Sequence, residues 1–267
     1  MGELTGEAVA ICRGKRGDFL QNGDPAAHFS GEASMTDTEV QQELLCIHHP
    51  HKQSKIIRRY LAGESVVNVL TRVIGPNVKC MQSMLFIKSA GKPGQAWHQD
   101  EDFIPTRDRS LTGAWIAIDD ATIDNGCLWV IPGSHKPGIL WPMHAHTDAR
   151  FDCTLESINF PYTDQDAVPV EVPAGSIVFF NGYLLHRSLP NKRRQGFRRV
   201  LVNHYMSAES LLPWRHVEGQ SMALQDYRDI VLIAGQDPYA YKGFEDIART
   251  HVRADGEGGC SDGRKLR

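Results

Sequence analysis

Residues 168–188 read VPVEVPAGSIVFFNGYLLHRS, and this stretch contains two short apolar runs that each end in a turn signal. Val168–Val172 is followed by Pro-Ala-Gly, and Ser176–Phe180 is followed by Asn-Gly. Proline and glycine at such positions form tight turns, and Asn-Gly is typical of hairpins. The stretch therefore predicts short strands joined by tight turns.

Four more apolar runs on the N- and C-terminal sides of this stretch extend the pattern. They are Met81–Lys88, Gly113–Ile118, Cys127–Ile131 and Val200–Tyr205. Strands this short and this closely spaced favour a sandwich or barrel over alternating βαβ units. The intervening segment Leu140–Asp166 has little pattern, and a loop of that length is usually functional or mobile.

Helical signals flank the β-rich part of the chain. Thr36 or Asp37 can cap a first helix, and Ser65 can cap a second one that ends before Gly75-Pro76. Ser221–Ala234 predicts a third helix. We therefore expect an irregular N-terminal segment (1–35), a single domain with a β core and flanking helices (36–253), and a disordered tail (254–267).

Composition excludes several classes of protein. The 267 residues carry 29 Lys and Arg against 32 Asp and Glu, so no basic field predicts nucleic-acid binding. There is no apolar run long enough to span a membrane and no secretory signal at the start. The six cysteines lack a C-x-x-C pair, which favours free thiols in a reducing compartment and hence a cytoplasmic protein.

The segment Trp97-His98-Gln99-Asp100 is a candidate metal site. If it is extended, His98 and Asp100 point to one side and Gln99 to the other. His186, which follows a strand and a turn, supplies a third candidate ligand. Two histidines and one carboxylate form the facial triad of non-haem iron(II) oxygenases, which leaves three coordination positions open. Alone, H-x-D is a weak pattern, and a surface pair stays open as the alternative.

Arg198 follows His186 by twelve residues, at the start of a predicted strand. A 2-oxoglutarate molecule that binds iron through its keto-acid end leaves a second carboxylate free. Arginine suits that carboxylate because its planar guanidinium binds two oxygens at once. The alternative is a solvated basic patch with the neighbouring cations Lys192, Arg193, Arg194 and Arg199. Spacing alone leaves both interpretations open.

Several motifs together resemble the phytanoyl-CoA dioxygenase family of iron(II)/2-oxoglutarate enzymes. Beside His98-Gln99-Asp100 and His186, the chain has N-G-C-L from Asn125, P-G-S-H-K from Pro132 and Q-G-F-R from Gln195. The resemblance implies a mainly β fold, the double-stranded β-helix or jelly roll, with flanking helices. It also implies metal ligands at His98, Asp100 and His186.

The resemblance further implies residues that bind the co-substrate. It places Arg198, rather than Arg199, against the distal carboxylate of 2-oxoglutarate, and it adds Ser188, Gln99 and Trp115 as cofactor-binding residues. A lysine that the family supplies from its N-terminal region has no match in residues 1–35. One contact to 2-oxoglutarate is therefore left without a residue.

The implied activity uses Fe(II), O2 and 2-oxoglutarate to hydroxylate an unactivated C–H bond of a small molecule, releasing succinate and CO2. Asp100 favours hydroxylation over halogenation, because related halogenases lack this carboxylate. The alternatives are a cupin-like metalloenzyme that does not use 2-oxoglutarate and a non-catalytic binding protein. We expect a monomer or homodimer. The sequence does not identify the substrate or say whether it is a CoA thioester.

Five other histidines are predicted to lie in solvated loops: His48, His49, His51, His144 and His146.

Overall fold

The computed structural model describes residues 2–17, 19–21, 24–29, 33–211 and 228–253. Its helices are α1 (Gly2–Cys12), α2 (Asp37–Gln42), α3 (Lys55–Leu61), α4 (Glu64–Val73) and α5 (Asp100–Phe103). Among these residues no helix is both long and apolar enough to cross a membrane.

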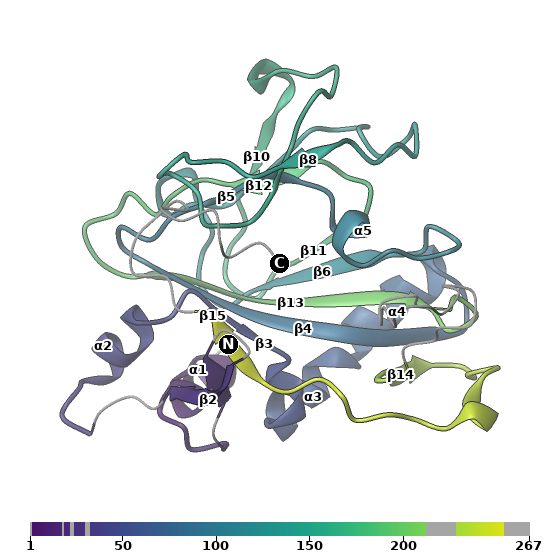
Figure 1. The fold of residues 1–267 in the computed structure, drawn as a ribbon, viewed down its shortest axis with the longest axis horizontal. Helices are drawn as coiled ribbons and strands as arrows, with labels where there is room; N and C mark the ends of the chain where they lie inside the picture. The colour runs from purple at the N-terminus through teal and green to yellow at the C-terminus, as the bar shows by residue number, and fades with distance from the viewer. Residues whose placement is uncertain (1, 18, 22–23, 30–32, 212–227, 254–267) are drawn as a thin grey trace.

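Two β-sheets face each other and make up most of the structure (Figure 1). The larger runs in the order β11 (Ile177–Asn181), β6 (Thr112–Ala117), β13 (Phe197–Ser207), β4 (Val78–Ser89), β3 (Cys46–His48), β15 (His251–Arg253), β1 (Phe19–Gln21) and β2 (Asp24–Phe29), with β14 (Val231–Ala234) also paired to β4. The smaller runs in the order β10 (Val168–Val170), β7 (Leu128–Val130), β12 (His186–Ser188) and β5 (Gln95–His98). A hairpin of β8 (Met143–His144) and β9 (Glu156–Ser157) belongs to neither.

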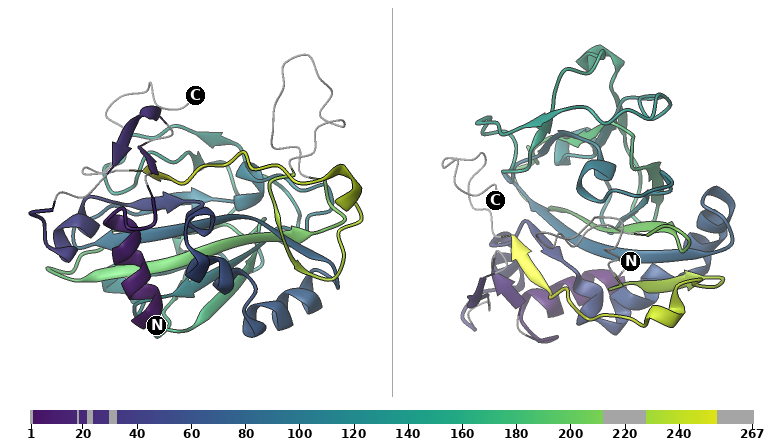
Figure 2. Two further views of the ribbon diagram at one scale, coloured as in Figure 1. Left: turned by 90° about the horizontal axis from the view of Figure 1, so that it is seen from below. Right: turned by 45° about the vertical axis from the view of Figure 1, so that its right-hand side comes forward.

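The larger sheet separates α1, α2, α3 and α4 from the site. In β4, Leu85 and Ile87 pack in a core cluster with side chains of α1, α2 and α3. Met84 and Phe86 project to the opposite face and line a pocket between the sheets. This alternation follows from the two-residue period of a strand. Figure 2 shows α1 to α4 on one side of the larger sheet, while the smaller sheet and α5 lie on the other side.

All six predicted strands are present, as β4, β6, β7, β10, β11 and β13. Thr36 caps α2 in a capping box with Glu39, as predicted. The cap of α4 is Gly63 rather than Ser65, which lies inside the helix, and the helix ends just before Gly75-Pro76. Local patterns located these elements because turn and cap chemistry acts over only a few residues.

Two secondary-structure predictions are wrong within the described residues. Residues 2–12 form a regular helix, α1, which buries Leu4, Ala8 and Ile11 on the sheet. Residues 231–234 form β14, where the periodicity predicted the end of a helix. Most of the predicted N-terminal half of that helix, and the tail 254–267, lie outside the described residues. The single-domain boundaries stay a prediction.

The cysteines and the additional histidines depart in part from expectation. Cys12, Cys46, Cys80 and Cys127 are buried and form no disulfide bond, as predicted. Cys153 is instead disulfide-bonded, so the prediction of free thiols throughout is wrong for that residue. His144 is exposed on β8, but the solvated-loop prediction is wrong for three others, which are buried: His49, His51 and His146.

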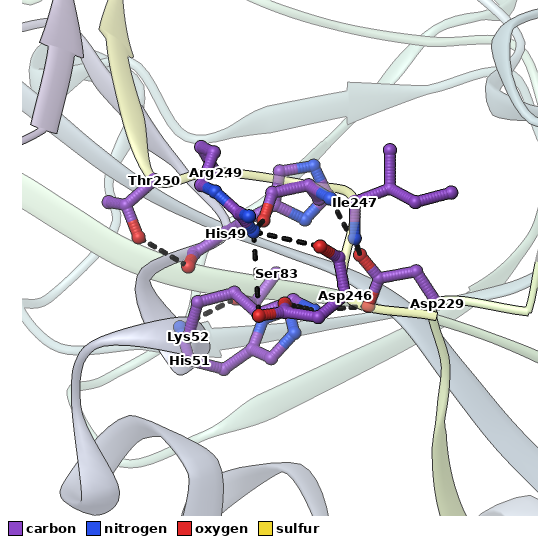
Figure 3. Close-up of polar contacts among 10 residues, drawn as sticks. His49, His51, Lys52, Ser83, Asp229, Asp246, Ile247, Arg249 and Thr250 are labelled. Carbon is purple, nitrogen blue, oxygen red and sulfur yellow. Dashed lines mark hydrogen bonds and ion pairs between the residues drawn. The ribbon is translucent and has the colours of Figure 1, made fainter. Parts of the chain in front are cut away.

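The segment from Asp229 to Arg253 is held against the rest of the chain by a polar cluster (Figure 3). Lys52 binds the carboxylates of Asp229 and Asp246. The hydroxyl of Thr250 donates a hydrogen bond to the carbonyl oxygen of His49 at 3.0 Å. His51 Nδ1 lies 2.6 Å from the hydroxyl of Ser83 on β4. The cluster therefore joins the C-terminal strand to the middle of the larger sheet.

Candidate active site

Strand pairing brings the two predicted histidine ligands together. His186 on β12 is the cross-strand partner of His98 on β5. Their ring centroids are 4.0 Å apart, and both side chains are buried. Residues that lie 88 positions apart in the sequence are therefore neighbours on one face of the smaller sheet.

Asp100 completes the group from a different element. The extended conformation predicted for residues 97–100 holds as far as Gln99, whose backbone is extended, and Asp100 is the first residue of α5. Its Oδ1 atom nevertheless lies 3.6 Å from Nε2 of His98 and 3.6 Å from Nε2 of His186. One ligand atom from each of the three residues lies within 4.8 Å of the others, which is a suitable spacing for one metal ion.

Backbone hydrogen bonds fix the orientation of both imidazole rings. Nδ1 of His98 lies 2.8 Å from the carbonyl oxygen of Ala96, and Nδ1 of His186 lies 2.9 Å from that of Leu184. Because a carbonyl oxygen only accepts, each Nδ1 carries the proton. Each Nε2 then directs its lone pair at the shared space, as in most histidine ligands of metals.

The protonation states also suit a metal. Burial, together with His186, lowers the pKa of His98 to about 4, so its imidazole is neutral near pH 7. Burial alone would raise the pKa of Asp100, but the adjacent His186, His204 and His98 outweigh it and hold the pKa well below its usual range. Neutral imidazole and ionised carboxylate are the forms that bind a metal ion.

The pocket that the triad lines is also lined by the arginine predicted to bind a carboxylate. Arg198 lines the pocket and is buried, with 3% of its surface exposed. Its Nε atom has no hydrogen-bond partner within the described residues, and its guanidinium lies 5.6 Å from the ring centroid of Trp115. Burial lowers its pKa to about 10, so it remains a cation near neutral pH. Arg199 points elsewhere and pairs with Asp119.

Lys88 is a second buried cation in this pocket, and sequence reasoning missed it. Its Nζ atom donates hydrogen bonds to Ser188 Oγ at 2.9 Å and to the carbonyl oxygen of Leu189 at 2.7 Å, and both acceptors are neutral. Burial, and then the nearby Arg198, lower its pKa well below the usual value. The available signal was strand alternation, because Lys88 shares its face of β4 with Met84 and Phe86.

Of the other three predicted cofactor-binding residues, two line the pocket and one does not. Ser188 and Trp115 line the pocket. Gln99 is not among the residues lining the pocket: its amide nitrogen donates to the carbonyl oxygens of Ile139 and Tyr183, and its amide oxygen accepts from the backbone N–H of Trp141. Gln99 therefore joins two loops to the segment between the ligands. This agrees with the expectation that it points away from His98.

His204 is the other residue that sequence reasoning missed. Its Nε2 atom lies 3.0 Å from Oδ2 of Asp100, and it lines the pocket from β13. It follows Arg198 by six residues on the same strand, and such an even spacing places both side chains on one face. Strand alternation from Arg198 could therefore have identified it.

The donor set fits an iron(II)-type site and a dicarboxylate co-substrate. Two imidazoles and one carboxylate are ligands that bind iron, and the group contains no cysteine of the described residues. Arg198, with its buried and unsatisfied Nε, and the nearby Lys88 line the same pocket, where an anionic ligand would interact favourably with both.

Comparison with known proteins shows similarity in both sequence and fold. The family model "Phytanoyl-CoA dioxygenase (PhyH)" matches residues 18–200. "Phytanoyl-CoA dioxygenase 1" of Oryza sativa subsp. japonica is 35% identical over 54% of this chain and 50% of its own length. "Phytanoyl-CoA dioxygenase domain-containing protein 1" of Danio rerio is 31% identical over 72% of this chain and 69% of its own. The chain thus spans about half of the rice relative and about two thirds of the zebrafish one.

Two solved structures have the same fold. One is the non-heme alpha ketoglutarate dependent carbocyclase SnoK, with 19% identity and a TM-score of 0.56 over 85% of this chain and 83% of that one. The other is the epimerase SnoN in complex with Fe3+, alpha ketoglutarate and nogalamycin RO, with 16% identity and a TM-score of 0.57 over 84% of both chains. These likenesses confirm the predicted jelly-roll fold. The match of the family model to residues 18–200 and the zebrafish relative show that the chain belongs to the phytanoyl-CoA dioxygenase family.

Proposed function

We propose that the protein is an Fe(II)- and 2-oxoglutarate-dependent dioxygenase that hydroxylates an unactivated C–H bond of a small molecule and releases succinate and CO2. The observation that carries this proposal is the presence, in one pocket, of a His-Asp-His group and a buried arginine with an unsatisfied Nε atom. Membership of the phytanoyl-CoA dioxygenase family supports it.

In this proposal His98, Asp100 and His186 hold the iron. Iron with bound 2-oxoglutarate supplies the oxygen activation, which no amino-acid side chain provides. The protein supplies orientation: the carbonyl oxygens of Ala96 and Leu184 fix the two imidazole rings so that each Nε2 faces the same point. Apolar side chains of the pocket, among them Phe180 and Val202, exclude water from that point.

Arg198, Lys88 and Ser188 bind the distal carboxylate of 2-oxoglutarate in this proposal. Arg198 provides a planar guanidinium, and Lys88 provides an ammonium group 2.9 Å from the hydroxyl of Ser188. Two buried cations side by side repel each other, and a bound carboxylate removes that repulsion. Lys88 also supplies the cationic contact for which residues 1–35 offered no match.

Asp100 supports hydroxylation as the outcome. Its Oδ1 atom lies 3.6 Å from Nε2 of both histidines and occupies the third protein position in the group. A halogenase of this type needs that position for chloride.

The cytoplasmic location and the monomeric or homodimeric state stay predictions, and the substrate is proposed only as a small molecule.

A metalloenzyme that does not use 2-oxoglutarate is the main alternative, followed by a non-catalytic binding protein. Neither accounts for Lys88 and Arg198, because a metal held by the triad alone requires no buried lysine and arginine in the same pocket. Asp152 lines the same pocket and raises the pKa of Lys88, but burial and Arg198 outweigh it and keep that pKa low, so a ligand that carries a carboxylate would be bound favourably here.

Anaerobic titration tests the proposal. The apoprotein is loaded with Fe(II), 2-oxoglutarate is added, and the absorbance is followed in the visible range. A charge-transfer band is expected, because chelation of iron by the keto-acid end produces one. Asp100→Asn serves as a control for the metal site and is expected to lose the band. Wild-type protein that binds iron but develops no band on addition of 2-oxoglutarate contradicts the proposal.

A further inference from the structure

We propose that His204 is a positioning residue that restricts Asp100 to a single metal-binding oxygen. The proposal rests on the proposed function, since it concerns how many positions around the metal stay open for the co-substrate and oxygen. His204 is not a metal ligand in it. The residue acts through Asp100.

The two carboxylate oxygens of Asp100 have different surroundings. Oδ1 lies 3.6 Å from Nε2 of His98 and 3.6 Å from Nε2 of His186, and it therefore faces the metal position. Oδ2 lies 3.0 Å from Nε2 of His204, within hydrogen-bonding distance. A carboxylate with one oxygen engaged by a protein donor presents only the other oxygen to a metal.

The hydrogen bond to Asp100 also determines how His204 is oriented. Both side chains are buried, with 4% of His204 and 8% of Asp100 exposed. The Nδ1 atom of His204 has no partner within the described residues, so the contact with Asp100 is the polar contact that holds the ring. An ionised Asp100 only accepts, so Nε2 of His204 carries the proton and donates it into the bond.

The number of oxygens that Asp100 offers decides how many positions stay open. Two imidazoles and one carboxylate oxygen leave three of six positions free, and 2-oxoglutarate and O2 together need three. If both oxygens of Asp100 bound the metal, one of those positions would be lost. Removing the donor of His204 frees Oδ2 to bind, so we expect weaker 2-oxoglutarate binding with the iron still held.

Three variants separate this role from simple packing. His204→Phe keeps a ring of similar size and removes the donor. His204→Gln keeps an N–H donor. Asn203→Leu is the matched control, because Asn203 is buried on the same strand and projects from the opposite face. Thermal unfolding of each variant checks that it is folded.

Two readouts are used on these proteins. Anaerobic titration gives the affinity of the iron-loaded protein for 2-oxoglutarate, and the absorbance of the Co(II)-loaded protein without 2-oxoglutarate reports the coordination number. We expect His204→Phe to bind iron but to lose about 10- to 100-fold in affinity for 2-oxoglutarate, with an altered Co(II) spectrum. His204→Gln is expected to recover most of that affinity, and Asn203→Leu to match the wild type.

The outcomes that overturn the inference are distinct from those that overturn the proposed function. If wild-type protein gives no charge-transfer band, the proposed function fails, while the Co(II) spectra still test His204. If His204→Phe has the same Co(II) spectrum and 2-oxoglutarate affinity as the wild type, the inference is wrong. It is also wrong if His204→Phe and His204→Gln are equally impaired, because the donor is then not what matters.

Discussion

Lys88 and Arg198 are cross-strand partners on β4 and β13, and both side chains are buried in the pocket beside the His-Asp-His group. Like charges opposite each other in a sheet destabilise it. The pKa of each is lowered, mainly by burial, and for Lys88 also by Arg198. A bound dicarboxylate removes this repulsion, so the pair is where mutations report most directly on 2-oxoglutarate binding.

Replacing Arg198 by lysine should weaken 2-oxoglutarate binding about tenfold or more, because lysine keeps the charge but loses the planar, two-point contact. The matched control is Arg199→Lys on the next residue, whose guanidinium pairs with Asp119 outside the pocket. Anaerobic titration of the charge-transfer band measures both affinities. Equal affinities in the two variants would show that Arg198 does not hold the carboxylate.

Replacing Lys88 by methionine removes the second cation while preserving most of its volume. Hydrogen bonds to charged groups contribute about 1.5–3 kcal/mol, so 2-oxoglutarate affinity should fall roughly 10- to 150-fold with Fe(II) affinity unchanged. Lys79→Met is the control, since Lys79 is also a buried lysine of β4 and donates to the carbonyl oxygen of Ser210. A loss of co-substrate affinity of the same size in Lys79→Met would assign the effect to general damage to the strand.

Replacing Gln99 by leucine should lower stability rather than co-substrate affinity. The three hydrogen bonds of its amide join the backbone at Ile139, Tyr183 and Trp141, and each contributes about 1 kcal/mol. We therefore expect the free energy of unfolding to fall by about 3 kcal/mol in urea titrations. A large drop in 2-oxoglutarate affinity without a loss of stability would instead support a cofactor contact at Gln99.

Stability should decrease as the pH falls below about 6.5, because of two buried histidines in the cluster of Figure 3. Burial, reinforced by His251, lowers the pKa of His49 to about 4, and burial with His49 lowers that of His51 to about 3. An unfolded histidine has a pKa near 6.5 and therefore binds a proton first. The stabilisation by the neutral histidines is complete above pH 6.5 and is lost as the pH falls toward 4 and 3.

A pKa shift of one unit corresponds to about 1.4 kcal/mol. Each histidine should therefore lower the free energy of unfolding by roughly 3 kcal/mol between pH 6.5 and 4. Urea unfolding at several pH values measures it. His49→Asn suits the left-handed backbone at that residue, where φ is 53°. That variant and His51→Asn should each have a shallower pH dependence, and the double variant the shallowest. A double variant with the wild-type slope would assign the acid sensitivity to other groups.

Strand and turn positions could be predicted because their signals are local. The run Ser176–Phe180 with its Asn-Gly turn became β11, within one residue at each end. The helix α1 was missed because residues 2–12 are stabilised by packing Leu4 and Ile11 on the sheet rather than by a strong local pattern. Similarly, the periodicity of residues 231–234 predicts a helix, but these residues form a strand because they pair with β4.

The sequence by itself determined the residue types of the site. His98, Asp100, His186 and Arg198 were identified from H-x-D and Q-G-F-R together with the resemblance to the phytanoyl-CoA dioxygenase family, and the structure brings all four into one pocket. Their spacing did not show how they face one another, because facing is set by the register between β5 and β12 and between β4 and β13.

Only the tertiary structure decided which side chains support the predicted ones. Lys88 lies beside Arg198, and His204 beside Asp100, through contacts between residues about a hundred positions apart. Alternation along a strand shows which face of the sheet a side chain is on, but not which residue of a neighbouring element contacts it. Gln99 shows the same limit, since the loops that use its amide are brought to it by the fold. The metal ligands can be identified from short sequence motifs. The side chains that contact those ligands depend on strand register, which is a property of the whole sheet.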